Sequence, residues 1–286
     1  MAPFPSLPGT DLRLGRRELL LGGAAAGFAL AVRPVAASTV TTATQGLTAG
    51  WVSVPAAGGA VRAYRARPVK GSGFPVVLVV QEIFGVHAYI QDVCRRLAQL
   101  GYLAIAPSLF DRQGDVTQLP DIPSILPLVA TVPDAQVMAD LDATAAWAAA
   151  SGEGDVARLG ITGFCWGGRI TWLYAAHNPK LRAGVAWYGR LVGQATALQP
   201  LFPIDLIAKL KAPVLGLYAG QDDGIPNESV QQMQTALKAA GSPSRIEVFP
   251  GVPHGFHADY RPTYRAAAAA AGWTQMRAWF RANGVV

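Results

Sequence analysis

The chain has 286 residues, of which 51% are hydrophobic and 15% are charged. A chain of this composition can bury a large core and is not intrinsically disordered, and its length allows one domain of roughly 240 to 250 residues. The formal net charge of +6 is partly carried by the first 33 residues, where four arginines accompany two acidic residues. Because no run of lysines and arginines is interleaved with aromatic residues, we expect no nucleic-acid partner.

The N-terminal segment, residues 1–37, has the pattern of an export signal. The pair Arg16 and Arg17 precedes an uncharged stretch over residues 19–32, and residues 35–37 offer a small-residue cleavage site. This order of features is typical of a twin-arginine signal peptide. The apolar stretch is short for a bilayer span, so we expect an exported, periplasmic protein without a stable membrane anchor after cleavage. A retained anchor and a chance hydrophobic leader are the alternatives.

Residues 38–286 are expected to form a single domain, because strand-like and helix-like segments alternate there without an internal repeat or a linker. The predicted strands are 51–55 and 61–68, which form a hairpin through Gly58-Gly59, and then 74–82, 102–110, 157–164, 182–189, 212–220 and 244–251. The predicted helices are 91–101, 134–151 and an Ala-rich segment that continues through 274–284. This alternation predicts an α/β domain with a mostly parallel central sheet and helices on both faces.

The stretch ITGFCWGGR places Cys165 at the end of a predicted buried strand and at the start of a helix. A nucleophile on such a turn needs small neighbours, and Gly163 and Gly167 stand two residues before it and two after it. Cys165 therefore occupies the position at which a hydrolase usually has a serine. The helix N-terminus also favours the thiolate over the thiol. Taken alone, the pattern suits a buried, inert cysteine beside packing glycines equally well.

Two later loops carry the residues that could complete a triad with Cys165. The α/β-hydrolase fold supplies nucleophile, acid and histidine in that chain order. Asp222 and Asp223 follow one predicted strand, and His254, followed by Gly255, comes after the next strand. Only one of the adjacent carboxylates can orient the imidazole, and the residues alone do not choose between them.

Five motifs are spread over most of the chain after residue 37, from Val76 to Tyr264. They are VVLVVQEIFGV, GYLAIAPSLFDRQGD, ITGFCWGGR, YAGQDDGIP and VPHGFHADYRPTY. Together they resemble the dienelactone hydrolase family, whose members use a Cys-Asp-His triad on an α/β-hydrolase fold. The resemblance implies an enzyme that cleaves a small-molecule ester or lactone through a thioacyl intermediate and needs no cofactor. It places the nucleophile at Cys165, the acid at Asp222, two residues before Gly-Ile-Pro, and the base at His254.

The resemblance also assigns residues around the triad. The family's glutamate falls on Glu82, where it takes the thiol proton or holds the cysteine unreactive until substrate displaces it. The alternative for Glu82 is a cap on the helix that follows. The backbone amides of Ile83 and Trp166 are the expected oxyanion hole, being the amide after the third strand and the amide after the nucleophile.

On the substrate side, this chain departs from the family. The family's enzymes hold a substrate carboxylate with arginines, one of them four residues after the histidine, where this chain has Ala258. The segment 119–136, where another such arginine would be sought, contains none. We predict that Arg261, Tyr188 and Phe256 contact the substrate, with structural packing as the alternative for each.

The cysteine content is low, with only Cys94 and Cys165. No Cys/His cluster has the spacing of a zinc site, so no metal is expected. One disulfide is possible in an oxidising compartment, although Cys94 has the pattern of a small buried helical residue. Two other function classes stay open: a thiol redox protein that uses Cys165, with Cys94 as its resolving cysteine, and a non-catalytic small-molecule binding protein on the same fold.

Overall fold

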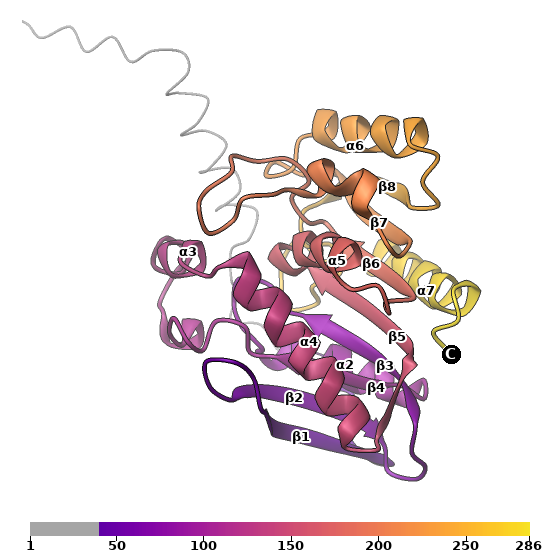
Figure 1. Cartoon of the computed structure of the whole chain (residues 1–286). Coiled ribbons are helices and arrows are strands. Elements are labelled where there is room, and N and C mark those ends of the chain that lie inside the picture. The colour runs from indigo at the N-terminus through magenta and orange to yellow at the C-terminus, as the bar shows by residue number, and fades with distance from the viewer. Residues whose placement is uncertain (1–39) are drawn as a thin grey trace, which may run out of the picture.

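The computed structural model of the protein describes residues 40–286, so the predicted signal peptide at 1–37 lies outside the described residues. Within this range, eight strands form one sheet in the order β1-β2-β4-β3-β5-β6-β7-β8 (Figure 1). β1 (Leu47–Val54) and β2 (Val61–Pro68) form the antiparallel hairpin expected from the sequence, and β2 also pairs antiparallel with β4. All the other neighbouring strands pair in parallel. The mostly parallel sheet is thus confirmed.

The middle of the sheet is fully enclosed. The remaining strands are β3 (Phe74–Val80), β4 (Leu103–Pro107), β5 (Gly154–Phe164), β6 (Ala183–Trp187), β7 (Val214–Gln221) and β8 (Arg245–Pro253). Every residue of β4 and β6 is buried, and residues 76–80 of β3 have no exposed surface. Strands covered on both faces need apolar side chains at every position, which is why these segments are continuous apolar runs without alternation.

Helices cover both faces of the sheet, with α4 and α5 over one face and α2 over the other (Figure 1). The helices are α2 (Ala88–Gln99), α3 (Ile122–Ala130), α4 (Asp134–Ala150), α5 (Trp166–His177), α6 (Asn227–Ala239) and α7 (Ala266–Ala282), with 3-10 turns η1 (Val116–Gln118) and η2 (Pro203–Lys209). The sequence interpretation did not include α3 or α6. Among residues 40–286, no single helix is long and apolar enough to cross a bilayer, and α3 and α4 meet that test only as a pair bent by 86°.

The carboxyl ends of the parallel strands bring the predicted site residues to one edge of the sheet. Glu82 follows β3, Cys165 follows β5 and Tyr188 follows β6. Asp222 directly follows β7, and His254 directly follows β8. Parallel strands end on the same side of a sheet, and loops at that edge are where open α/β folds bind their ligands. The fold thus gathers residues that are up to 172 positions apart in the chain, from Glu82 to His254.

Candidate active site

Cys165 occupies a strained turn between β5 and α5. Its backbone dihedrals, φ 53° and ψ −114°, lie in a region that residues with a side chain rarely adopt. A Cβ atom at Gly163 would lie 2.1 Å from the carbonyl oxygen of Gly167, and one at Gly167 would lie 2.4 Å from the carbonyl oxygen of Val80. Only glycine fits at both positions, because the turn, the helix and the end of β3 approach one another so closely. The G-x-C-x-G pattern thus has a steric cause.

The imidazole of His254 lies between a carboxylate and the thiol. Its Nδ1 donates to Oδ2 of Asp222 at 2.7 Å, and its side chain is also hydrogen-bonded to that of Cys165. Burial works against the charged imidazole, but the negative charges of Asp222 and Cys165 outweigh burial and raise the pKa of His254 from 6.5 to about 10. The arrangement therefore favours the protonated imidazolium form of His254 at neutral pH.

Two backbone amides decide which of the adjacent carboxylates faces His254. Oδ1 of Asp222 accepts hydrogen bonds from the N–H groups of Gly224 at 2.9 Å and Ile225 at 3.0 Å. These bonds fix the carboxylate so that its other oxygen meets the imidazole. Asp223 is exposed and makes no ion pair among the described residues. The partner of the imidazole is thus Asp222.

Glu82 is fully buried and belongs to a network next to the triad. Its Oε2 accepts a hydrogen bond from the hydroxyl of Tyr260 at 2.6 Å, and Nε2 of His87 lies 3.5 Å from the same oxygen. Burial alone would raise the pKa of Glu82, but the hydrogen bond from His87 and the charge of Arg261 outweigh burial and lower it to about 2. Within residues 40–286, no hydrogen bond joins Glu82 to Cys165, and Glu82 does not cap α2.

A pocket of about 320 Å³ is lined in part by Cys165. It is lined by Ile83, Leu126, Val129, Ala130, Cys165, Trp166, Arg169, Arg190, Gln199 and Phe202. Ile83 and Trp166, whose amides are the expected oxyanion hole, thus share the pocket with Cys165. Neither amide donates a backbone hydrogen bond within the described part of the chain, so both are available to a ligand. A larger hollow of about 680 Å³ is lined by Arg182 and by none of Cys165, Asp222 and His254.

The three predicted substrate-contacting residues do not line this pocket. Tyr188 and Phe256 have no exposed surface, and Arg261 is 4% exposed. The ring of Tyr188 meets that of His254 edge to face, with centroids 5.0 Å apart and an interplanar angle of 63°, and Tyr188 also packs on Phe256. The guanidinium of Arg261 lies over the ring of Phe84 at 5.1 Å. These three residues are buried in the core and are not among the residues that line the pocket.

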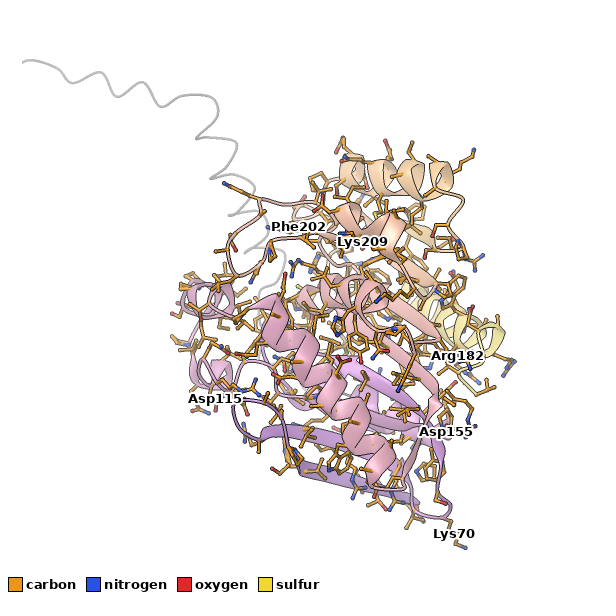
Figure 2. The ribbon with its side chains drawn as sticks, viewed as in Figure 1. Lys70, Asp115, Asp155, Arg182, Phe202 and Lys209 are labelled. Atoms are coloured by element: carbon orange, nitrogen blue, oxygen red, sulfur yellow. The ribbon has the colours of Figure 1, made fainter. Side chains whose placement is uncertain are left out.

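Four polar or aromatic pocket residues were missed by sequence reasoning. Arg190 follows β6, and Arg169 lies one helical turn after Cys165. Gln199 and Phe202 come from the segment before η2. Figure 2 shows Phe202 far from Asp155, which lies near the start of β5, whereas Cys165 follows the end of that strand. The only local signal was Arg169, within the nucleophile motif. The other three come from a segment without regular structure, and only the fold shows that it faces the site.

The second cysteine lies apart from this chemistry. Cys94 is fully buried in the middle of α2, and burial raises the pKa of its thiol well above the ordinary range. Neither Cys94 nor Cys165 is in a disulfide. A thiol with a raised pKa attacks other sulfur groups poorly, so Cys94 is ill suited to act as a resolving cysteine. No group of His, Cys, Asp and Glu residues within 40–286 could hold a metal ion.

Known proteins of similar sequence and fold identify the family. The sequence profile of the dienelactone hydrolase family matches residues 61–284. A protein of Methylorubrum extorquens provisionally named carboxymethylenebutenolidase is 58% identical over 95% of this chain and 94% of its own length. An Escherichia coli protein of the same provisional name is 56% identical over 90% of this chain and 96% of its own length.

A solved structure agrees with these matches. The crystal structure of a provisionally named dienelactone hydrolase from Klebsiella pneumoniae has a TM-score of 0.81 to this chain and is 55% identical to it. The match covers 82% of this chain and 98% of that one. With the profile match over residues 61–284 and two relatives above 50% identity, the chain belongs to the dienelactone hydrolase family and is a hydrolase of esters or lactones.

Proposed function

We propose that this hydrolase cleaves a small-molecule ester or lactone with Cys165 as its nucleophile and a thioacyl-enzyme as its intermediate. The observation that carries the proposal is the arrangement of Cys165, His254 and Asp222, with the imidazole hydrogen-bonded to both other side chains. A nucleophile, a base and a group that orients the base make up the general pattern of covalent catalysis by hydrolases.

In the first half-reaction, the Cys165 thiolate attacks the carbonyl carbon and forms a C–S bond. The carbonyl oxygen becomes an oxyanion, for which the amides of Ile83 and Trp166 are the proposed donors. The tetrahedral adduct then collapses, the C–O bond to the alcohol breaks, and the imidazolium of His254 donates its proton to the departing oxygen. The products are a thioester on Cys165, the alcohol and a neutral imidazole.

In the second half-reaction, water releases the acid. The neutral imidazole of His254 accepts a proton from the water, whose oxygen attacks the thioester carbon. The C–S bond breaks, Cys165 leaves as the thiolate and the imidazolium is restored. Asp222 holds the imidazole in the correct tautomer through both steps. Every atom and charge is thus returned to the resting state without an added cofactor.

Glu82 is assigned here to the control of the thiol. Its carboxylate, held by Tyr260 and His87, is ionised and stands directly before Ile83 in the chain. To accept the thiol proton, as the family resemblance implies, it must form a hydrogen bond to Cys165. Its other oxygen, Oε1, has no hydrogen-bond partner within residues 40–286, so that bond does not require loss of the contacts with Tyr260 and His87.

The proposed nucleophile is tested by the hydrolysis of p-nitrophenyl acetate with repeated turnover. Cys165→Ala is expected to abolish turnover, and Cys165→Ser to fold but hydrolyse poorly, because an alkoxide is far harder to generate than a thiolate. Cys94→Ala is the matched control and should keep its activity. Mass spectrometry of the acid-quenched wild type should detect an acyl group on Cys165. Wild-type turnover by Cys165→Ala would mean that another residue is the nucleophile.

We further propose that the protein is exported through a twin-arginine signal at residues 1–37 and acts in the periplasm without a membrane anchor. Support comes from the arginine pair, the weakly apolar stretch after it and the small residues at 35–37. An exported thiol is exposed to oxidants. The nearly complete burial of Cys165, which is 2% exposed, suits such a compartment.

A further inference from the structure

The pocket at Cys165 is lined by two segments that are distant in sequence. Leu126, Val129 and Ala130 come from α3, and Gln199 and Phe202 come from the segment 191–202. We call α3 and the segment 191–202 together the cover. The catalytic side chains beneath it are almost unexposed, since His254 is 1% exposed. The cover therefore bounds the space that a substrate group can fill.

One half of the cover is held firmly to the nucleophile helix. The guanidinium of Arg169 makes two parallel bonds of 2.7 Å to the carboxylate of Asp134. It also donates to the carbonyl oxygen of Leu201 at 2.6 Å and lies over the ring of Phe202 at 4.9 Å. The backbone N–H of Asp134 donates to the carbonyl oxygen of Leu198 at 2.9 Å. A buried bidentate pair of this kind is strong and geometrically specific, so the part of the segment from Leu198 to Phe202 is fixed.

Besides the bond from Asp134 to Leu198, one side chain ties the end of α3 and the turn after it to that segment. The amide Nε2 of Gln199 donates to the carbonyl oxygens of Val129 at 3.3 Å and Val132 at 3.4 Å. These distances exceed those of ordinary N–H···O bonds, and one amide group serves both. Within the described residues, no other hydrogen bond joins α3 to the segment 191–202. Gln199 thus joins α3 to the segment 191–202 only by long hydrogen bonds, and it also lines the pocket.

We propose that Gln199 is a specificity-determining residue that limits the size of the substrate group admitted above Cys165. By holding the end of α3, it keeps Leu126 and Val129 over a pocket of only about 320 Å³. Release of this link lets Leu126 and Ala130, which are not buried, shift away from the thiol, while Ile122 and Ile125 keep α3 packed on the core. The inference rests on the proposed function, since it concerns the same thiol and the same pocket.

The test is a chain-length series on the full-length protein. kcat/KM is measured for p-nitrophenyl acetate, butanoate and hexanoate with the wild type, Gln199→Met and Gln199→Glu. Methionine keeps most of the volume of glutamine and loses the donor, and glutamate places a carboxylate against two carbonyl oxygens. We expect both variants to raise the ratio of hexanoate to acetate kcat/KM by about tenfold, the lower end of what a change of one methylene in a pocket is worth.

Gln194→Met is the matched control, because Gln194 is exposed in the same segment and makes no side-chain hydrogen bond among the described residues. Its ratio should equal that of the wild type. An unchanged ratio in both Gln199 variants, with acetate turnover retained, would overturn the size limit and leave the cysteine hydrolase standing. Failure of the wild type to turn over any ester would overturn the proposed function and this inference with it.

Discussion

Amidation of Asp222 is the sharpest test of the triad, because asparagine changes the charge and almost nothing else. Its side-chain oxygen can still accept the bonds from the amides of Gly224 and Ile225. The atom that faces His254 becomes an NH₂ group, which cannot accept a hydrogen bond from Nδ1. The imidazole must then take the other tautomer, with its proton directed at the thiol of Cys165 and no lone pair there.

The magnitude can be worked from the pKa of His254. A pKa of about 10 in place of 6.5 corresponds to roughly 5 kcal/mol in favour of the imidazolium, at about 1.4 kcal/mol for each pKa unit. Asp222 is the larger of the two charges that raise it. Its removal lets burial lower the pKa of His254, so the imidazolium loses its proton at a lower pH. We expect kcat to fall by about 10⁴-fold, as in other triads whose orienting acid was amidated.

The assay is steady-state hydrolysis of p-nitrophenyl acetate across pH, with far-ultraviolet circular dichroism as the check on folding. Asp223→Asn is the matched control, since Asp223 is exposed, and it should change kcat less than about twofold. If Asp223→Asn proves to be the damaging substitution, or if Asp222→Asn folds and keeps its rate within tenfold of the wild type, the assignment of the acid to Asp222 is refuted.

Three further outcomes follow from the described contacts and from the N-terminal pattern. Because the pKa of Glu82 is lowered from 4.5 to about 2, its contribution to stability is complete above pH 4.5 and is lost as the pH falls through 2. The unfolding temperature of Glu82→Gln should therefore lie well below that of the wild type at pH 7, and the difference should narrow in acid. A difference that stays constant with pH would contradict this. Arg190→Gln should weaken kcat/KM for the p-nitrophenyl monoester of succinate by about tenfold relative to the neutral butanoate, whereas Arg182→Gln, in the separate 680 Å³ hollow, should leave that ratio unchanged. Replacement of both Arg16 and Arg17 by lysine should leave precursor in the cytoplasm in cell fractionation, because the signal is expected to need the guanidinium groups themselves; normal periplasmic accumulation would count against the signal.

The fold was predictable because its main signals are local. A continuous apolar run indicates a strand covered on both faces, as in β3, and a glycine pair indicates the hairpin between β1 and β2. The helix α3 was missed because its nine residues include Pro123 in the first turn and Pro127 inside, which suggest a loop. Its amphipathic pattern is too short to outweigh two prolines. Local pattern therefore identified the sheet and failed at the element that roofs the pocket.

The site was predictable only as far as chain order and motif reach. Cys165 and His254 could be singled out because a glycine-flanked cysteine and a scarce histidine stand at strand ends. The choice of Asp222 over Asp223 depends on two backbone amides, and a sequence shows residue types and not the direction of N–H groups. Arg190 and Gln199 could not be found, because a loop residue joins a pocket through packing between segments that are far apart in the chain.

The strained backbone at Cys165 restricts how this position can change in evolution. A side-chain-bearing residue at φ 53° and ψ −114° costs on the order of 1–3 kcal/mol, a sizeable fraction of the roughly 5–15 kcal/mol that separates a folded domain from its unfolded chain. Glycine would relieve that strain and remove the thiol. Selection for thermal tolerance and selection for turnover therefore act in opposite directions at this one position, and gains in robustness must come from the rest of the chain.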